Sequence, residues 1–329
     1  MTDPQVDIRE NELFELSPQL LNMLLKDHTL STDNEQVNIF WATDNYADRG
    51  KGYQYNDQIK IEAITGPNGN IIMPRAVKTR EQQQQRSREM AEVFTPLWIC
   101  NKQNNLVDNA WFGRDSVFNT EVDNPNGTHS WIVNNEPIVV PEGKTWRDYV
   151  NENRLEITCG EAPYLVSRYD TVTGVFIPVE QRIGLLDRKL RVVGENTFTT
   201  REWLKATQSA YQSIYGFEWQ GDNLVLAREA LLYTFVDYYR AKFGKDPHLK
   251  SLLYIAYIIS WNIWQMDGLK GVIPNSCHST IVKDLFDINE NIQKCEGCRQ
   301  NNIHKHNGIY CKIRDWKKNK VITFVSLIK

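Results

Sequence analysis

The segment Arg154–Tyr169, RLEITCGEAPYLVSRY, constrains the fold of this chain more than any other. From Leu155 to Thr158, apolar and polar residues alternate with the period of a β-strand. Gly160 permits a tight turn, and Pro163 suits the first turn of a helix. The segment therefore predicts a strand, a glycine turn and the start of a helix. In α/β proteins, nucleotide-like ligands bind at such turns.

Many buried strand–turn–helix units bind nothing, so three other segments provide the necessary context. Upstream, the sequence EVFTP at Glu92–Pro96 precedes an apolar helical run. Downstream, Ile214–Phe217 is predicted to form a strand ending at Glu218, and a helical pattern through Leu224–Leu232 follows it. Further on, Asp267 ends the apolar run IISWNIWQMDGL.

In this order the four segments resemble gamma-class DNA adenine methyltransferases, especially modification subunits of restriction–modification systems. EVFTP is similar to the family's threonine-proline segment, and TCGEAPYL to its glycine motif. GFEWQGDNLVLAREALL and NIWQMDGL are similar to its acidic and aspartate segments. The resemblance extends from about Ala91 to Gly271. It implies an α/β fold, namely a Rossmann-like methyltransferase sheet with helices on both faces.

The resemblance also implies S-adenosyl-L-methionine as cofactor. Glu218 would accept hydrogen bonds from the ribose hydroxyls, and Asp267 would accept one from the adenine amine. Gly160 would let the backbone approach the methionine portion, which Thr95 would help to hold. Taken singly, Glu218 is also explained as a solvated loop carboxylate, and Asp267 as a helix cap or a turn residue. The expected cofactor-binding residues are Thr95, Glu156, Cys159, Gly160, Glu218 and Asp267.

The chain departs from the family pattern in three places. Ala162 replaces the second glycine, and an insertion at about 177–205 must lengthen the interval between Gly160 and Glu218. The chain has no Pro-Pro dipeptide, so the family's Asn/Asp-Pro-Pro-aromatic catalytic motif is missing. Ile273–Ser276, IPNS, stands in about the right place but is predicted to be a turn. The catalytic residues are therefore unknown. A partner subunit could supply the loop, the enzyme could be degenerate, or the gene product could be shortened.

A cysteine- and histidine-rich segment follows. Cys295-Glu296-Gly297-Cys298 is a C-x-x-C knuckle, whose glycine allows the turn that aims both sulfurs at one point. We expect one closed structural zinc site on which the order of this segment depends, with His304 or His306 able to replace one thiolate. A redox pair and a polar loop with incidental cysteines are the alternatives. The predicted ligands are Cys277, Cys295, Cys298 and Cys311.

Composition limits the partners. The 329-residue chain carries a net charge of −3, so nucleic acid could bind only to a local patch. The last segment, CKIRDWKKNKVITF, interleaves basic and aromatic residues and is either such a patch or a solvated strand face. The apolar run Leu252–Trp264 is too short to span a bilayer, and the N-terminus lacks a signal-peptide pattern. A cytoplasmic location without membrane contact is expected.

Three regions are predicted: an N-terminal helical and β extension at 1–79, a methyltransferase-like domain at 80–272, and a cysteine- and histidine-rich zinc segment with a basic C-terminal strand at 273–329. The first functional hypothesis is an S-adenosylmethionine-binding DNA adenine methyltransferase-like protein of a restriction–modification or related defence system. DNA and a second subunit would be its partners. The alternative is a non-catalytic zinc-containing module, derived from a methyltransferase, that binds nucleic acid or protein.

Overall fold

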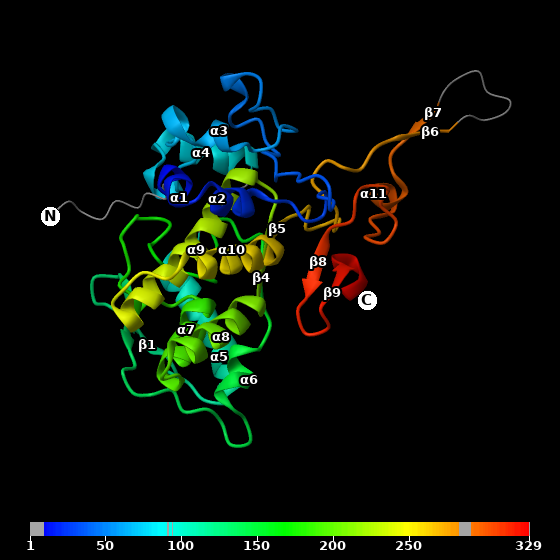
Figure 1. The fold of residues 1–329 in the computed structure, drawn as a ribbon. Helices are drawn as coiled ribbons and strands as arrows, with labels where there is room; N and C mark the ends of the chain where they lie inside the picture. The colour runs from blue at the N-terminus through cyan, green and yellow to red at the C-terminus, as the bar shows by residue number, and fades with distance from the viewer. Residues whose placement is uncertain (1–9, 91, 94, 283–290, 329) are drawn as a thin grey trace.

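The fold is mixed α/β, with a parallel three-stranded sheet at its centre (Figure 1). The computed structural model describes residues 10–90, 92–93, 95–282 and 291–328, so Phe94 of the EVFTP segment lies outside the described residues. The sheet contains β3 (Arg154–Ile157), β4 (Ile214–Glu218) and β5 (Ile263–Gln265) in that order. Both neighbouring pairs are parallel, so the carboxyl ends of the three strands share one edge.

One face of the sheet carries the main hydrophobic core. Ile214 and Ile263 point to this face, where they join a cluster that includes α9 residues such as Leu224 and α10 residues such as Ile259. α9 is buried along most of its length because it packs between the sheet and other helices. Two helices connect each strand of the sheet to the next. They are α7 (Leu185–Asn196) and α8 (Thr200–Gln212) between β3 and β4, and α9 (Gly221–Phe243) and α10 (Leu249–Asn262) between β4 and β5.

Helices were expected on both faces of the sheet, but the C-terminal hairpin packs on the second face. Phe217 and Trp264, which are register partners, point to this face and pack against Phe324 near the C-terminus. The ring centroids of Phe324 and Trp264 are 5.6 Å apart. Among the described residues, a C-terminal β-hairpin and the short helix after it cover this face. The structure thus supports the α/β class, while a complete Rossmann-like sheet remains an expectation.

The expected helix directly after Gly160 is absent from the described residues. Residues 161–166 form turns, and α7 begins only at Leu185. Leu185 N donates to Tyr164 O at 2.8 Å, so residues 167–184 loop out between the turns and the helix. The Asp187 carboxylate closes this loop, since it accepts from Ser167 N at 2.8 Å and from Gly184 N. The interval between Gly160 and Glu218 thus contains this loop and then two helices, α7 and α8, and the insertion at about 177–205 stays a prediction.

The N-terminal region contains helices but no strand among its described residues. The β structure expected within the extension at 1–79 amounts to isolated bridges, such as Phe40 with Gln58. The side chain of Gln265 forms the two hydrogen bonds to the Phe40 backbone that a neighbouring strand would form. Gln265 Nε2 of β5 donates to Phe40 O at 2.8 Å, and Gln265 Oε1 accepts from Phe40 N at 3.0 Å. The elements are α1 (Glu10–Leu16), α2 (Pro18–Leu25), η1 (Ala47–Arg49), α3 (Ile61–Ile64), η2 (Gly66–Asn68) and η3 (Arg75–Val77).

Between this region and the sheet lie two helices, a hairpin and a short helix. A turn at 124–127 closes the hairpin, where Gly127 N donates to Asn124 O at 3.0 Å. The Thr145 hydroxyl caps the short helix by accepting from Asp148 N. These elements are α4 (Arg80–Met90), α5 (Leu97–Phe112), β1 (Asn119–Asp123), β2 (His129–Val133) and α6 (Trp146–Val150), with η4 (Val179–Gln181) in the loop at 167–184.

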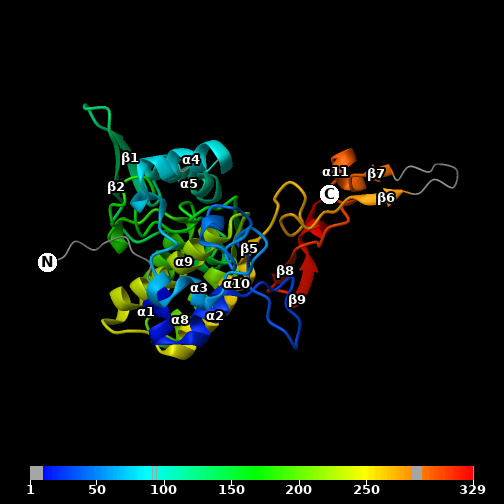
Figure 2. The same cartoon turned by 90° about the horizontal axis from the view of Figure 1, so that it is seen from above.

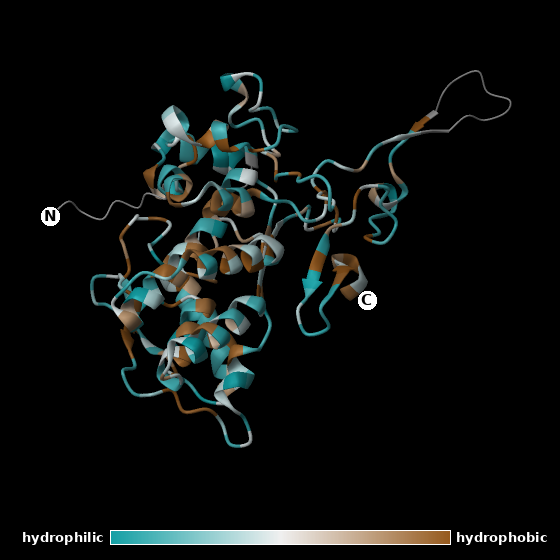
Figure 3. Cartoon of the chain, viewed as in Figure 1, coloured by the Kyte–Doolittle hydropathy of each residue, from teal (hydrophilic) through white to brown (hydrophobic). Residues whose placement is uncertain are grey.

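The C-terminal region lies to one side of the helical body in both ribbon views (Figures 1 and 2). Its helix α11 is mostly hydrophilic, whereas α10 is largely hydrophobic (Figure 3). No helix among the described residues is long and apolar enough to cross a membrane. The region comprises β6 (Thr280–Val282), β7 (Asn291–Gln293), α11 (Glu296–Gln300), β8 (Lys312–Asp315), β9 (Lys320–Thr323) and η5 (Phe324–Leu327).

The turn after β3 is strained at Thr158, a β-branched residue with a φ of 49°. Replacing Thr158 with Asn should raise the free energy of unfolding by about 0.5–1 kcal/mol, because Asn tolerates left-handed backbone and the exposed threonine buries little. Denaturant unfolding measures the change. Thr120→Asn, in the extended backbone of β1, is the matched control and should not stabilise the protein. Equal effects of the two substitutions would contradict strain at Thr158.

Candidate functional site

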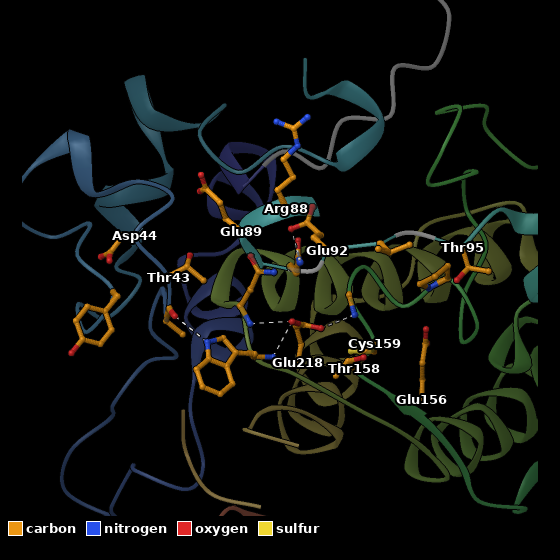
Figure 4. Close-up of a pocket in the computed structure, with 18 of the residues that line it drawn as sticks. Thr43, Asp44, Arg88, Glu89, Glu92, Thr95, Glu156, Thr158, Cys159 and Glu218 are labelled. Carbon is orange, nitrogen blue, oxygen red and sulfur yellow. Dashed lines mark hydrogen bonds between the residues drawn. The ribbon is translucent and has the colours of Figure 1, made fainter. Parts of the chain in front are cut away.

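A pocket of about 940 Å³ opens at the carboxyl ends of β3 and β4 (Figure 4). It brings together residues from three segments that are far apart in the sequence: the stretch before α5, the turn after β3, and the end of β4. Five of the six expected cofactor-binding residues line it, namely Thr95, Glu156, Cys159, Gly160 and Glu218.

Asp267 is the sixth expected residue, and its side chain does not line this pocket. Its Oδ2 atom forms an ion pair with Lys270 Nζ at 2.9 Å, and its Oδ1 atom accepts from Leu269 N at 3.1 Å. A backbone bridge between Asp267 and Val272 closes the turn around these contacts. Asp267 therefore organises the turn after β5 in this structure.

Glu218 joins the ends of two strands. Its Oε2 atom accepts from Gly160 N at 2.9 Å, and its Oε1 atom accepts from Trp219 N at 2.9 Å and Gln220 N at 3.1 Å (Figure 4). Burial raises the pKa of Glu218, although these backbone N–H groups act in the opposite direction. A carboxylate offers about four acceptor positions, so roughly one remains for a ligand.

Glu156 is buried, and its side chain rises from β3 into the pocket (Figure 4). Its Oε1 atom accepts from Tyr164 N at 3.4 Å, while its Oε2 atom has no hydrogen-bond partner in the described structure. Burial raises the pKa of Glu156 well above its usual range, and the nearby Glu218 carboxylate adds to the effect. A buried carboxyl group with a free oxygen is suited to a ligand that donates hydrogen bonds or carries a positive charge.

A buried charge network fixes another wall of the pocket. Arg86 Nε lies 2.7 Å from Glu92 Oε2, and a terminal guanidinium nitrogen lies 2.7 Å from Asp222 Oδ2. The Tyr46 hydroxyl donates to the same Asp222 oxygen at 2.9 Å. Burial opposes ionisation of Asp222, but the charges of Arg86 and Lys78 hold its pKa below the usual value. The network connects α4 to the start of α9, so that both pack rigidly beside the pocket.

The charges around the pocket are mainly negative, even though Arg86 neutralises one of them. This arrangement attracts a cationic ligand and repels a phosphate group, because like charges at close range raise the energy of the bound state. The acidic lining residues are Asp44, Glu89, Glu92, Glu156 and Glu218, and the basic one is Arg88. Burial raises the pKa of Glu156 and Glu218, so the negative charge lies mainly on the other acidic residues.

Several lining residues escaped prediction from the sequence. Thr43 and Asp44 belong to the N-terminal extension, and Asn223 follows the end of β4. Asn275, interpreted as part of a turn, has a φ of 60° and also lines the pocket. The position of IPNS after β5 was the one available signal for Asn275. Nothing local in the sequence indicated the contribution of Thr43 or Asp44.

A second candidate site lies in the C-terminal region, where Cys277, Cys295, Cys298 and His306 form a group. Their ligand atoms all lie within 4.8 Å of one another. His306 Nδ1 is 3.5 Å from Cys277 Sγ, 3.5 Å from Cys295 Sγ and 3.7 Å from Cys298 Sγ. For a tetrahedral ion with zinc–sulfur bonds near 2.3 Å and zinc–nitrogen bonds near 2.0–2.1 Å, this separation is about 3.6 Å. The group could therefore hold a metal ion such as zinc.

The fourth member of this group is His306 and not the predicted Cys311. Cys311 is fully buried in the cluster that contains Phe217 and Trp264, and its thiol donates to Gln265 O at 3.4 Å. Cys311 N also donates to Gly271 O at 3.0 Å, so the residue is fixed in the core immediately before β8.

Gly297 has a different role from the expected one. A Cβ atom at this position would lie 2.6 Å from the backbone nitrogen of His306 and 2.6 Å from its Nδ1 atom. The missing side chain thus lets His306 approach the knuckle. Within the knuckle, Cys298 N donates to Cys295 Sγ at 3.4 Å, which orients the two sulfurs.

No protein-family model, curated protein sequence or solved structure matches this chain. The resemblance to DNA adenine methyltransferases is therefore a hypothesis that rests on the four sequence segments, three of which contribute residues to the pocket.

The metal group gives a direct prediction. His306→Ala should weaken zinc binding by more than about tenfold because it removes one of four ligands, whereas His304→Ala should not. Elemental analysis and competition with a coloured chelator measure the zinc content and affinity. Chelation should also loosen the chain around Cys277, Cys295 and His306 and leave the α/β core, with the hairpin packed on it, folded. A Cys311→Ser protein that loses zinc as readily as His306→Ala would contradict this ligand set.

The buried carboxyl group predicts a pH dependence. The folded-state pKa of Glu156 is raised above its ordinary value of 4.5, so folding favours its protonated form. Its contribution to stability is full below pH 4.5 and is lost as the pH rises towards the folded-state pKa. Relative to Glu156→Gln, the wild-type free energy of unfolding should fall by at most about 1.4 kcal/mol per pH unit in this window. Urea unfolding of both proteins at several pH values tests this, and a constant difference would contradict it.

Proposed function

We propose that the chain is an S-adenosylmethionine-binding, DNA adenine methyltransferase-like protein of a restriction–modification or related defence system, with a zinc ion at the C-terminal cysteine and histidine group. One observation carries the proposal. Residues that the family resemblance assigned to the cofactor come from separate segments, and five of them line one acidic pocket at the ends of parallel strands.

The pocket suits much of this cofactor. S-adenosylmethionine carries an ammonium and a sulfonium group, and the sulfonium supplies the methyl group for transfer. The free oxygen of Glu156 would receive a charged hydrogen bond from the ammonium group. The remaining acceptor position of Glu218 would accept from a ribose hydroxyl. The volume of about 940 Å³ lies within the range of known ligand pockets, roughly 300–1,000 Å³.

Two features differ from the family expectation. Asp267 does not line the pocket, so the amide groups of Asn223 and Asn275 are the candidates for hydrogen bonding to the adenine ring. The Pro-Pro-aromatic motif is missing from the chain. We infer that DNA is the substrate and that a second subunit supplies the loop that holds the target base.

A non-catalytic binding module is the second candidate function. It is favoured by the grouping of Cys277, Cys295, Cys298 and His306 in a chain that lacks the catalytic motif. Lys317 and Lys318 beside Trp316 would then contact nucleic acid or a partner protein.

Calorimetry tests the cofactor proposal. S-adenosylmethionine and its demethylated product should both bind the pure protein, and Glu156→Gln should weaken binding of both by up to about 3 kcal/mol because a charged hydrogen bond is lost. Glu121→Gln, on the exposed hairpin, is the matched control and should bind normally. Absence of binding to wild type would refute the pocket assignment.

The two candidate functions differ in a labelled-methyl assay with DNA. The split-enzyme version of the first expects transfer only when the second subunit is present. Transfer by the isolated chain would eliminate the non-catalytic module. Failure of transfer in both conditions, with cofactor binding intact, would favour the module.

A further inference from the structure

We propose that the free edge of β3, together with the groove beside it, binds an extended segment of a partner protein, which adds to the sheet as a further strand. The partner segment carries apolar side chains at alternate positions and acidic residues at its ends. This surface lies outside the candidate cofactor pocket, so the proposal does not depend on the identity of the cofactor.

The first observation is the unsatisfied outer edge of β3. Among the described strands, β3 pairs with β4 alone. Arg154 N donates to Ser213 O at 2.9 Å on the β4 side. Since alternate residues of a strand bond to the same neighbour, the N–H and C=O groups of Leu155 and Ile157 point to the other side. Of these four groups only Ile157 O has a described partner, the hydroxyl of the next residue. Such an edge is a template for another strand.

The second observation is the exposure of apolar side chains on this strand. Leu155 is 44% exposed and Ile157 is 68% exposed, although both point to the same face as the buried Phe217 and Trp264. The C-terminal hairpin covers this face over β4 and β5 and leaves it bare over β3. Exposed aliphatic residues of this kind, continuous with a core, are typical of a binding surface.

The third observation is a groove of about 580 Å³ between β3 and the hairpin. Alternate residues of an added strand would point their side chains into this groove. Its apolar wall includes Leu155, Tyr215, Trp264, Ile322, Phe324 and Leu327.

The charges around the groove indicate the chemistry of the partner. Of the residues of the hairpin that line it, three are basic and one is acidic, namely Arg314, Lys317, Lys318 and Asp315. Acidic residues at the ends of the added segment would therefore be attracted. A second copy of this chain would instead bring like charges together. A nucleic acid offers no regular series of donors and acceptors that could pair with the backbone of β3.

The position of the edge has a consequence for the pocket. β3 leads directly into the turn at Cys159 and Gly160, which lines the candidate cofactor site. A strand added beside β3 would thus bring the partner's neighbouring residues to the rim of that site. If the cofactor proposal holds, this surface is where a second subunit supplies the groups that the chain lacks.

The test uses the full chain and a fluorescent synthetic peptide in which valine and threonine alternate between glutamates at both ends. Anisotropy should show saturable binding, and Ile157→Lys should weaken it by about tenfold or more. Ile132→Lys is the matched control, since Ile132 is 66% exposed on another strand, β2. A peptide methylated at alternate backbone nitrogens should bind more weakly because it loses donors. Circular dichroism checks that both variants fold.

Amide hydrogen exchange gives an independent measurement, because the Leu155 and Ile157 amides should exchange more slowly when the peptide is bound. Absence of peptide binding, or equal binding to Ile157→Lys, would overturn the proposal. Concentration-dependent dimerisation that Ile157→Lys abolishes would identify a second copy as the occupant and overturn it as well. The proposal would also be overturned if a DNA duplex slowed the exchange of these amides and the peptide did not.

Discussion

The geometry of the candidate pocket depends on the carboxylate of Glu218. No helix follows Gly160 directly, so the backbone N–H groups of this turn need other acceptors. Glu218 accepts from Gly160 N and, at the same time, from the two residues after its own strand. One side chain thus holds the turn after β3 against the end of β4. Gly216 assists, because a Cβ atom there would lie 3.2 Å from Cys159.

Local patterns in the sequence predicted the strands around this carboxylate correctly. Alternation identified β3, the short stretch Ile214–Phe217 identified β4, and a helical pattern through Leu224–Leu232 identified α9, because these signals lie within each segment. The turn after Gly160 could not be predicted in this way. Its path depends on Asp187, which binds Ser167 and Gly184 and closes the loop at 167–184. Contacts between residues so far apart leave no periodic trace in the sequence.

The metal group illustrates the same limit. The spacing of the C-x-x-C knuckle predicted Cys295 and Cys298 as members of one group, and the structure places them together with Cys277. Spacing alone could not choose between Cys311 and His306 for the fourth position. Burial decides it: Cys311 precedes β8, where it packs into the hydrophobic cluster beside β5, while Gly297 leaves room for His306 beside the knuckle.

The metal group and the pocket are joined by a short stretch of chain. Asn275 lines the pocket, and Cys277, two residues later, belongs to the metal group. The intervening Ser276 hydroxyl donates to Ile273 O at 2.7 Å and accepts from Ile309 N at 3.0 Å.

Ile273 N also donates to Ile309 O at 2.8 Å. The segment that carries Asn275 is therefore hydrogen-bonded to the segment that follows His306. An ion bound by Cys277 and His306 would fix these two segments relative to each other. Part of the pocket wall would then owe its position to the metal, although the metal lies outside the pocket. In this arrangement the stretch that leads into the cysteine- and histidine-rich segment contributes Asn275 to the wall of the pocket beside the three-stranded sheet.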